Sequence, residues 1–243
     1  MKRNIIALIL FFTALYSTAQ VTNCAINFER NGRVSLGILQ DISTASGTTI
    51  QLWFNPKHWI PGANIITWGN KFNVQLGAPG QLIINNTDDN ITFTDSNLTS
   101  GNWAHITILL NGNRISLLVN NANEQNGMME APFVLPVDEP FLLGGGFLGL
   151  IDEVRIWDFI LPDSYNRFWN NTIDHFNPSW KHLYGYWKFD QTRLTNNVYD
   201  YSENGHNGTF SAKGVKRVTV TDNAKFVYRR NLAYSDCSRF FDR

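Results

Sequence analysis

The acidic pair Asp152-Glu153 is the clearest place in this sequence where side chains could do chemistry. It lies in the run from Gly149 to Trp157, where β-branched and aromatic residues recur with the period of two that is typical of a strand. A carboxylate buried in such a strand must be paired, hydrogen-bonded or bound to a metal to offset its desolvation. Asp152 therefore needs a partner. The alternative is that the two carboxylates straddle the sheet and face solvent or a nearby cation.

A second candidate is the segment from Lys57 to Gly62, which interrupts the strand pattern and is typical of a loop. An exposed Trp59 in this loop could stack on the apolar face of a sugar ring. Residues 88–90 are a second candidate rim, where the carboxylates of Asp88 and Asp89 could accept hydrogen bonds from sugar hydroxyls. We therefore predict Trp59, Asp88 and Asp89 as ligand-binding residues. The alternative for Trp59 is a loop anchor that packs on the core.

The composition is that of a globular chain with one sizeable core. The chain has 243 residues, a formal net charge of zero, 43% hydrophobic residues and eight Trp. All-β domains of this size commonly fold as one unit. A nucleic-acid surface would show clustered Lys and Arg in excess, so the balanced charge argues against a nucleic-acid partner.

The first 19 residues have the pattern of a signal peptide. Lys2 and Arg3 precede the apolar run from Ile5 to Leu15, and the small-residue site Ser17 to Ala19 follows. The apolar run is short for a membrane span, and no second one occurs later. We expect a secreted or cell-surface protein without a membrane span, whose residues 20–243 form a single domain.

The two cysteines, Cys24 and Cys237, lie close to the two ends of the mature chain. Export makes a disulfide bond chemically possible. Closing so long a loop could stabilise the fold by about 4 to 5 kcal/mol on the chain-entropy model. We predict the disulfide, because nothing else in the sequence gives either cysteine a metal-binding or catalytic setting. The alternative is two unpaired thiols.

The elements that must position these residues are almost all strands. An Asn-Gly pair at 31–32 predicts a β-hairpin from Cys24 to Gly37, because both residues tolerate positive φ. A second hairpin, from Trp103 to Asn120, is apolar on both faces, which predicts a central position in a sheet. One short helix is predicted after the Ile-Asp-Glu-Val strand, because Pro162 and Asp163 suit a first turn and apolar residues recur at helical spacing up to Ile173.

The order of these motifs closely resembles LamG-like (laminin G-like) domains of the concanavalin A-like lectin/glucanase superfamily, of the bacterial secreted type. The resemblance spans about residues 23 to 212 and implies an all-β jelly-roll of two antiparallel sheets. It is carried by the segments Ala25–Phe28, Thr49–Phe54, Trp103–His105, Asn111–Gly112, Gly149–Trp157, Gly185–Asp190 and Asp200–Thr209.

The resemblance also implies a structural calcium ion near the edge of the sandwich, with Asp152, Asp200 and Asn204 as its ligands. Calcium prefers several oxygen ligands on a compact polar loop, and residues 200–208 have that composition. The alternative is an Asx-rich turn that is stabilised by its own hydrogen bonds. Glu203 departs from the glycine that the family commonly has at this position, which puts the path of the loop in doubt.

The same superfamily contains glucanases, which need two carboxylates across the glycosidic bond. Adjacent strand residues project to opposite faces, so Asp152 and Glu153 are not expected to share one substrate. No catalytic residues are predicted. The sequence therefore favours a non-catalytic lectin-like binding or adhesion module whose partner is a glycan. The alternatives are a glycan-active hydrolase with a dispersed carboxylate pair, or a structural domain that binds an extracellular protein.

Overall fold

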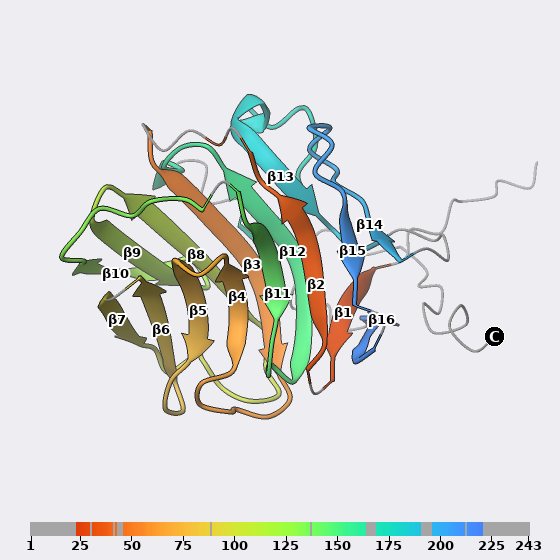
Figure 1. Cartoon of the computed structure of the whole chain (residues 1–243), viewed down its shortest axis with the longest axis horizontal. Helices are drawn as coiled ribbons and strands as arrows, with labels where there is room; N and C mark the ends of the chain where they lie inside the picture. Colours follow the sequence, from red (N-terminus) through yellow and green to blue (C-terminus); the bar gives the residue numbers. More distant parts are fainter. Residues whose placement is uncertain are drawn as a thin grey trace, which may run out of the picture.

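The chain folds into two antiparallel sheets of eight strands each, stacked face to face (Figure 1). This computed structural model describes residues 23–29, 31–40, 42, 46–87, 89–136, 138–163, 169–190, 196–211 and 213–220. The predicted all-β jelly-roll of two antiparallel sheets is confirmed. The predicted signal peptide lies outside the described residues.

Sheet A contains the acidic strand near its centre. β12 pairs with β1 over its first residues and with β13 over its last residues, so that one strand joins two short neighbours on the same side. The strands in order are β10 (Ala122–Met128), β9 (Arg114–Val119), β8 (Ala104–Asn111), β3 (Thr48–Pro56), β12 (Gly149–Trp157), β1 (Cys24–Phe28) and β16 (Val215–Thr219), with β13 (Leu183–Trp187) beside β12.

Sheet B lies in front of sheet A in Figure 1 and includes a four-stranded meander, β4 to β7. Its strands in order are β14 (Asn197–Val198), β15 (Gly208–Phe210), β2 (Arg33–Ile38), β11 (Pro140–Gly144), β4 (Asn64–Trp68), β5 (Phe72–Leu76), β6 (Gln81–Asn86) and β7 (Asp89–Thr94).

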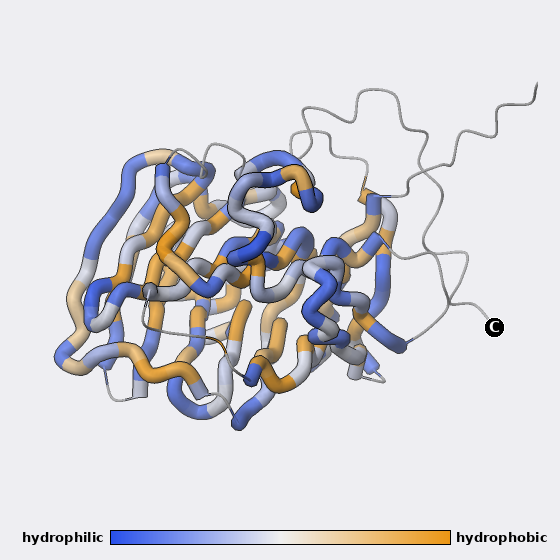
Figure 2. The backbone as a smooth tube through the Cα atoms, turned by 90° about the horizontal axis from the view of Figure 1, so that it is seen from above, coloured by the Kyte–Doolittle hydropathy of each residue, from blue (hydrophilic) through white to orange (hydrophobic). Residues whose placement is uncertain are grey.

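The core lies between the sheets and follows from the period of two in the strands. In β5, Phe72, Val74 and Leu76 are buried while Asn73 and Gln75 are only half-buried. Such alternation gives each sheet one apolar face, and the two apolar faces stack in one continuous core. Hydrophilic residues gather in the outer turns of the chain, as Figure 2 shows from above.

A second, smaller layer covers the outer face of sheet A. Trp157 and Tyr186 project from that face and pack with Leu161 and Ile173 of the segment that follows β12. Trp169 of the same segment stacks on Trp53 of β3 with ring centroids 5.3 Å apart. We call the described parts of this segment, residues 158–163 and 169–182, the covering segment.

The predicted hairpin from Trp103 to Asn120 is confirmed, whereas the prediction of a hairpin from Cys24 to Gly37 is wrong. β8 and β9 pair with each other and stand inside sheet A, where β10 forms the edge. β1 and β2, in contrast, belong to different sheets. The turn between them, where Gly32 N–H donates to the Glu29 carbonyl at 3.0 Å, carries the chain from one sheet to the other. Both strands alternate, and that pattern suits facing sheets as well as paired strands.

The predicted helix does not extend to Ile173. Asp163 is helical, residues 164–168 lie outside the described residues, and Trp169 to Ile173 form a turn and irregular chain. The Asn171 carbonyl accepts a hydrogen bond from Arg155 of β12 instead of from a helical N–H. Beyond Asp163, the one helical segment in the described part is the short 3₁₀ helix η1 (Trp180–His182).

Candidate functional site

Trp59 lies in the loop after β3, and the turn between β5 and β6 holds the polar edge of its indole ring. The indole N–H donates to the carbonyls of Gly77 and Ala78, with N···O distances of 3.0 and 3.1 Å. The ring is half-buried and packs against the core. Trp59 is therefore anchored, as the alternative for this residue expected. The anchoring also fixes the orientation of the exposed part of the ring.

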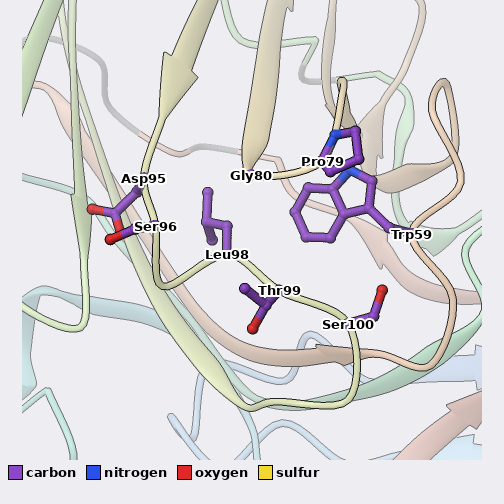
Figure 3. Close-up of a pocket in the computed structure, with 8 residues that line it drawn as sticks. All are labelled: Trp59, Pro79, Gly80, Asp95, Ser96, Leu98, Thr99 and Ser100. Atoms are coloured by element: carbon purple, nitrogen blue, oxygen red, sulfur yellow. The ribbon is translucent and has the colours of Figure 1, made fainter.

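That exposed part forms one wall of a pocket of about 310 Å³ (Figure 3). Pro79 lies beside the indole, Leu98 lies across from it, and Ser100 lies next to it. Three loops build the pocket: the loop after β3, the turn between β5 and β6, and the loop after β7. The lining residues are Trp59, Pro79, Gly80, Asp95, Ser96, Leu98, Thr99 and Ser100.

Hydrogen bonds between and within these loops fix the shape of the pocket. Asp95 N–H donates to the Gly80 carbonyl at 2.9 Å, and Leu98 N–H donates to the Asp95 carbonyl at 3.2 Å. One carboxylate oxygen of Asp95 accepts from both the N–H and the side-chain amide of Asn97. In Figure 3 this carboxylate points away from Trp59. The pocket thus combines an aromatic wall with hydroxyl groups and presents no charge to the indole.

Asp89 does not join Trp59. Its two carboxylate oxygens accept hydrogen bonds from the N–H groups of Asn90 and Glu130, at 2.7 and 2.8 Å. It lines a separate pocket of about 370 Å³ together with Lys71 and Glu130. Asp88 lies outside the described residues. The structure therefore places Asp89 in a different pocket from Trp59.

The acidic pair sits on a β-bulge, which overturns the expectation that its side chains project to opposite faces. Asp152 pairs with Trp53, but Arg155, three residues later, pairs with Gln51, only two residues earlier. Ile151 and Val154 both enter the core. The extra residue places Asp152 and Glu153 together on the outer face of sheet A, with Glu153 at a φ of 53°.

Glu153 is the centre of a buried ionic cluster. It is 1% exposed and accepts hydrogen bonds from the guanidinium of Arg155, at 3.0 Å, and from the hydroxyl of Tyr186. The same guanidinium donates to the Asn171 carbonyl of the covering segment. Burial, and then the charge of Glu153, raises the pKa of Tyr186 well above its usual value. These groups tie the covering segment to the sheet.

His105 lies on the same covered face. Its ring contacts both Trp53 and Trp169, with centroids 5.3 and 5.1 Å away. Burial lowers the pKa of His105 well below its usual value, and the nearby charge of Arg155 lowers it further. His105 is therefore neutral in the folded protein at neutral pH.

Asp200 lies beside the free edge of β13 and is saturated by protein donors. One oxygen accepts from the N–H groups of Tyr186 and Ser202, and the other from the Ser202 hydroxyl and the His206 N–H, all between 2.8 and 3.0 Å. Burial alone would raise its pKa, but hydrogen bonds from His206 and Ser202 outweigh burial and lower it.

The calcium ligands predicted from the resemblance do not fit one ion in this arrangement. All four acceptor positions of Asp200 face protein hydrogens, and the amide nitrogen of Asn204 donates to the carbonyls of Leu183 and Tyr184. Asp152 accepts from Glu153 N–H on the outer face of sheet A, beside Trp53. Among the described residues, no three His, Cys, Asp or Glu side chains are grouped to hold a metal ion. The 200–208 loop has the hydrogen bonds of an Asx-rich turn.

Cys24 starts β1, is buried and is not a free thiol. Cys237 lies outside the described residues, so the Cys24–Cys237 disulfide remains a prediction. No helix in the part of the chain that the structure describes is long and apolar enough to cross a membrane.

Sequence reasoning missed two sets of residues. Leu98, Thr99 and Ser100 complete the Trp59 pocket, and their only signal is a run of small polar residues typical of a loop. Arg155 could have been found as the partner of Glu153, because strand residues two apart share a face. Tyr186 could not, because its position depends on the pairing of β12 with β13.

Two stacked antiparallel sheets of eight strands each define a jelly-roll sandwich. Residues 28–164 match the laminin G family model described as the concanavalin A-like lectin/glucanases superfamily. This match covers more than half of the chain, and the chain belongs to that superfamily.

Solved structures show the same fold. A protein from Bacteroides ovatus, provisionally named a carbohydrate binding protein, aligns with a TM-score of 0.64 and 19% identity over 84% of this chain. This chain spans 61% of that protein's length. A heptameric SAP-like pentraxin from Limulus polyphemus aligns with a TM-score of 0.53 and 12% identity, over 83% of this chain and 97% of its own. No curated protein matches the chain.

Proposed function

We propose that this chain is a secreted or cell-surface, non-catalytic module that binds carbohydrate through the Trp59 pocket. The observation that carries the proposal is the fixed indole wall of this pocket. A sugar ring has apolar C–H faces that suit an aromatic surface and a rim of hydroxyls that suits polar neighbours. Because the indole N–H is already bound to Gly77 and Ala78, stacking requires no change in its orientation.

The chemistry around Trp59 supports binding rather than hydrolysis. A glycosidase needs two carboxylates placed across the scissile bond. Among the described residues that line the pocket, Asp95 is the only one with a carboxylate. Glu153 of the acidic pair is buried beneath the covering segment and bound to Arg155 and Tyr186. The provisional name of the Bacteroides ovatus protein agrees with a carbohydrate-binding role.

Glycan-array binding of the chain without residues 1–19 tests the proposal, with Trp59→Ala as the first variant. We expect a defined class of glycan to bind and Trp59→Ala to weaken binding at least about thirtyfold, since a buried aromatic contact is a typical binding hot spot. Phe176→Ala is a matched control, because Phe176 is 81% exposed and belongs to the covering segment, away from the pocket. This variant is expected to bind as the wild type does.

The other outcomes separate the alternatives. Glycan binding that survives Trp59→Ala would keep the function and move the site. Release of new reducing ends from a bound glycan would establish the hydrolase instead. Binding to no glycan would overturn the proposal and favour an extracellular protein as the partner.

A further inference from the structure

Two histidines that lie apart in the sequence line one pocket that the proposed function does not use. His182 stands at the end of the covering segment, in η1, and His206 lies in the 200–208 loop beside the free edge of β13. Their pocket has a volume of about 210 Å³ and shares no lining residue with the Trp59 pocket. The fold therefore brings two imidazole rings to one hollow of the surface.

Each of these rings is held by its Nδ1 atom. His182 Nδ1 lies 3.0 Å from a carboxylate oxygen of Asp158. His206 Nδ1 lies 3.0 Å from the Tyr184 carbonyl oxygen and 3.4 Å from a carboxylate oxygen of Asp200. Carbonyl and carboxylate oxygens accept hydrogen bonds, so each Nδ1 carries a hydrogen and donates it. In the neutral rings the lone pair is then on Nε2.

This arrangement of the two rings is the one that metal-binding histidines have. A histidine that binds a metal ion through one nitrogen almost always donates its other N–H to a carboxylate or a backbone carbonyl. That second contact fixes the tautomer and makes the ligating nitrogen more basic. His182 has the carboxylate contact, and His206 has the carbonyl contact.

Stacking fixes the planes of both rings. Phe159 stacks on His182 with ring centroids 4.5 Å apart, and Tyr184 stacks on His206 with ring centroids 4.4 Å apart. The side chains of His182 and His206 are nevertheless 38% and 17% exposed, so an ion can reach them from solvent. Rings that are already ordered lose little conformational freedom when they bind.

The other groups of the pocket narrow the class of ion. Asn204 uses its amide nitrogen for the carbonyls of Leu183 and Tyr184, so its side-chain oxygen is the atom left to accept. Gln40 offers a further amide oxygen, and Lys181 is exposed, so that it can turn away from a cation. Imidazole suits Zn²⁺, Cu²⁺ and Ni²⁺, whereas Ca²⁺ takes oxygen ligands. Among the described residues no third His, Cys, Asp or Glu side chain joins the two rings, so water would complete the coordination.

We propose that His182 and His206 bind one divalent transition-metal ion, of the class of Zn²⁺ or Cu²⁺, through their Nε2 atoms. The inference does not depend on the proposed carbohydrate binding. Asp158 and His182 stand at the two ends of the covering segment, where the Asp158 N–H also donates to the His182 carbonyl at 3.0 Å. The ion would therefore fasten the base of the covering segment to the 200–208 loop.

Titration calorimetry with zinc chloride tests the proposal on the untagged chain without residues 1–19, freed of metal beforehand. We expect one Zn²⁺ for each chain. His182→Gln and His206→Gln should each weaken binding at least about tenfold, because the loss of a second-shell partner alone typically costs about 10- to 100-fold. Asp158→Ala keeps both rings, removes the carboxylate behind His182 and should weaken binding about tenfold.

His175→Gln is the matched control, because His175 is an exposed histidine of the same covering segment and does not line the pocket. It is expected to bind zinc as the wild type does. A circular-dichroism melt of each metal-free variant checks that it folds. Zinc binding that persists in both His182→Gln and His206→Gln, or no saturable zinc binding by the wild type, would overturn the proposal.

Bound Cu²⁺ provides a check on the wild type that needs no variant. Electron paramagnetic resonance reports the nitrogen ligands of this ion, and we expect two imidazole nitrogens. A single imidazole nitrogen would show that the two rings do not share an ion, and the two-histidine site would be wrong.

Discussion

The two outer faces of the sandwich differ in whether their polar side chains are buried or accessible. The outer face of sheet A carries Glu153, Arg155 and His105, all buried beneath the covering segment. The outer face of sheet B carries half-buried amides and hydroxyls, among them those of Thr67, Asn73 and Asn85, and no segment in the described part of the chain covers them as the covering segment covers sheet A. Buried charges need partners inside the protein, so the first face is committed to holding the fold together. The second face has hydrogen-bonding groups left for a partner.

The largest expected effect is on the covered face. Glu153→Ala would leave the guanidinium of Arg155 buried without its carboxylate and should destabilise the fold by about 3 to 5 kcal/mol in urea unfolding. Thr92→Ala on the open face removes an accessible side chain and should cost less than about 1 kcal/mol. If the two substitutions cost the same, the contrast between a structural face and an available face is wrong.

A smaller effect is expected from pH. The pKa of His105 is lowered in the folded state, so below the unfolded value of about 6.5 the unfolded chain binds a proton that the native protein does not. Stability should therefore fall as the pH drops from about 6.5 towards the folded pKa, by up to about 1.4 kcal/mol per pH unit.

Unfolding free energies measured from pH 7.5 to 5.5 check this slope. His105→Gln should flatten it, whereas His58→Gln, which removes an exposed histidine, should keep it. A slope that survives in His105→Gln would show that groups outside the covered face set the pH dependence.

The smallest expected effect is that of calcium. The four acceptor positions of Asp200 are occupied by protein donors, so excess calcium and EDTA should give melting temperatures within about 1 °C of each other. A melting temperature that is clearly higher in excess calcium than in EDTA would mean that the 200–208 loop rearranges to bind the ion. It would also show that polar groups next to sheet A remain available to a ligand.

Much of the fold could be predicted from the sequence, because alternation and turn residues determine where strands begin and end. The hairpin of β8 and β9 and the strand β12 follow from that pattern. The partner of β1 does not, since the same alternation suits pairing within a sheet and stacking between sheets. The bulge at Asp152 and Glu153 has no glycine or proline to mark it. A single extra residue there reversed the predicted orientation of Glu153.

The candidate site was predictable only in part. Trp59 could be placed in a loop because its segment breaks the strand pattern. The pocket around it could not, because Pro79 and Leu98 reach Trp59 only through the pairing of β5, β6 and β7. The separation of Asp89 from Trp59 has the same cause, since Asp89 begins β7 and the pocket residue Asp95 follows the other end of that strand.

The pairing of β1 with β16 has a mechanical consequence. The register places Cys24 opposite Thr219, so β1 begins and β16 ends at the same end of one antiparallel ladder. A pulling force applied through the segments before β1 and after β16 would open that ladder like a zipper, one rung at a time, rather than shear all its rungs together. The first hydrogen bond to carry the load is the one that the Val220 N–H donates to the Asn23 carbonyl, at 3.0 Å.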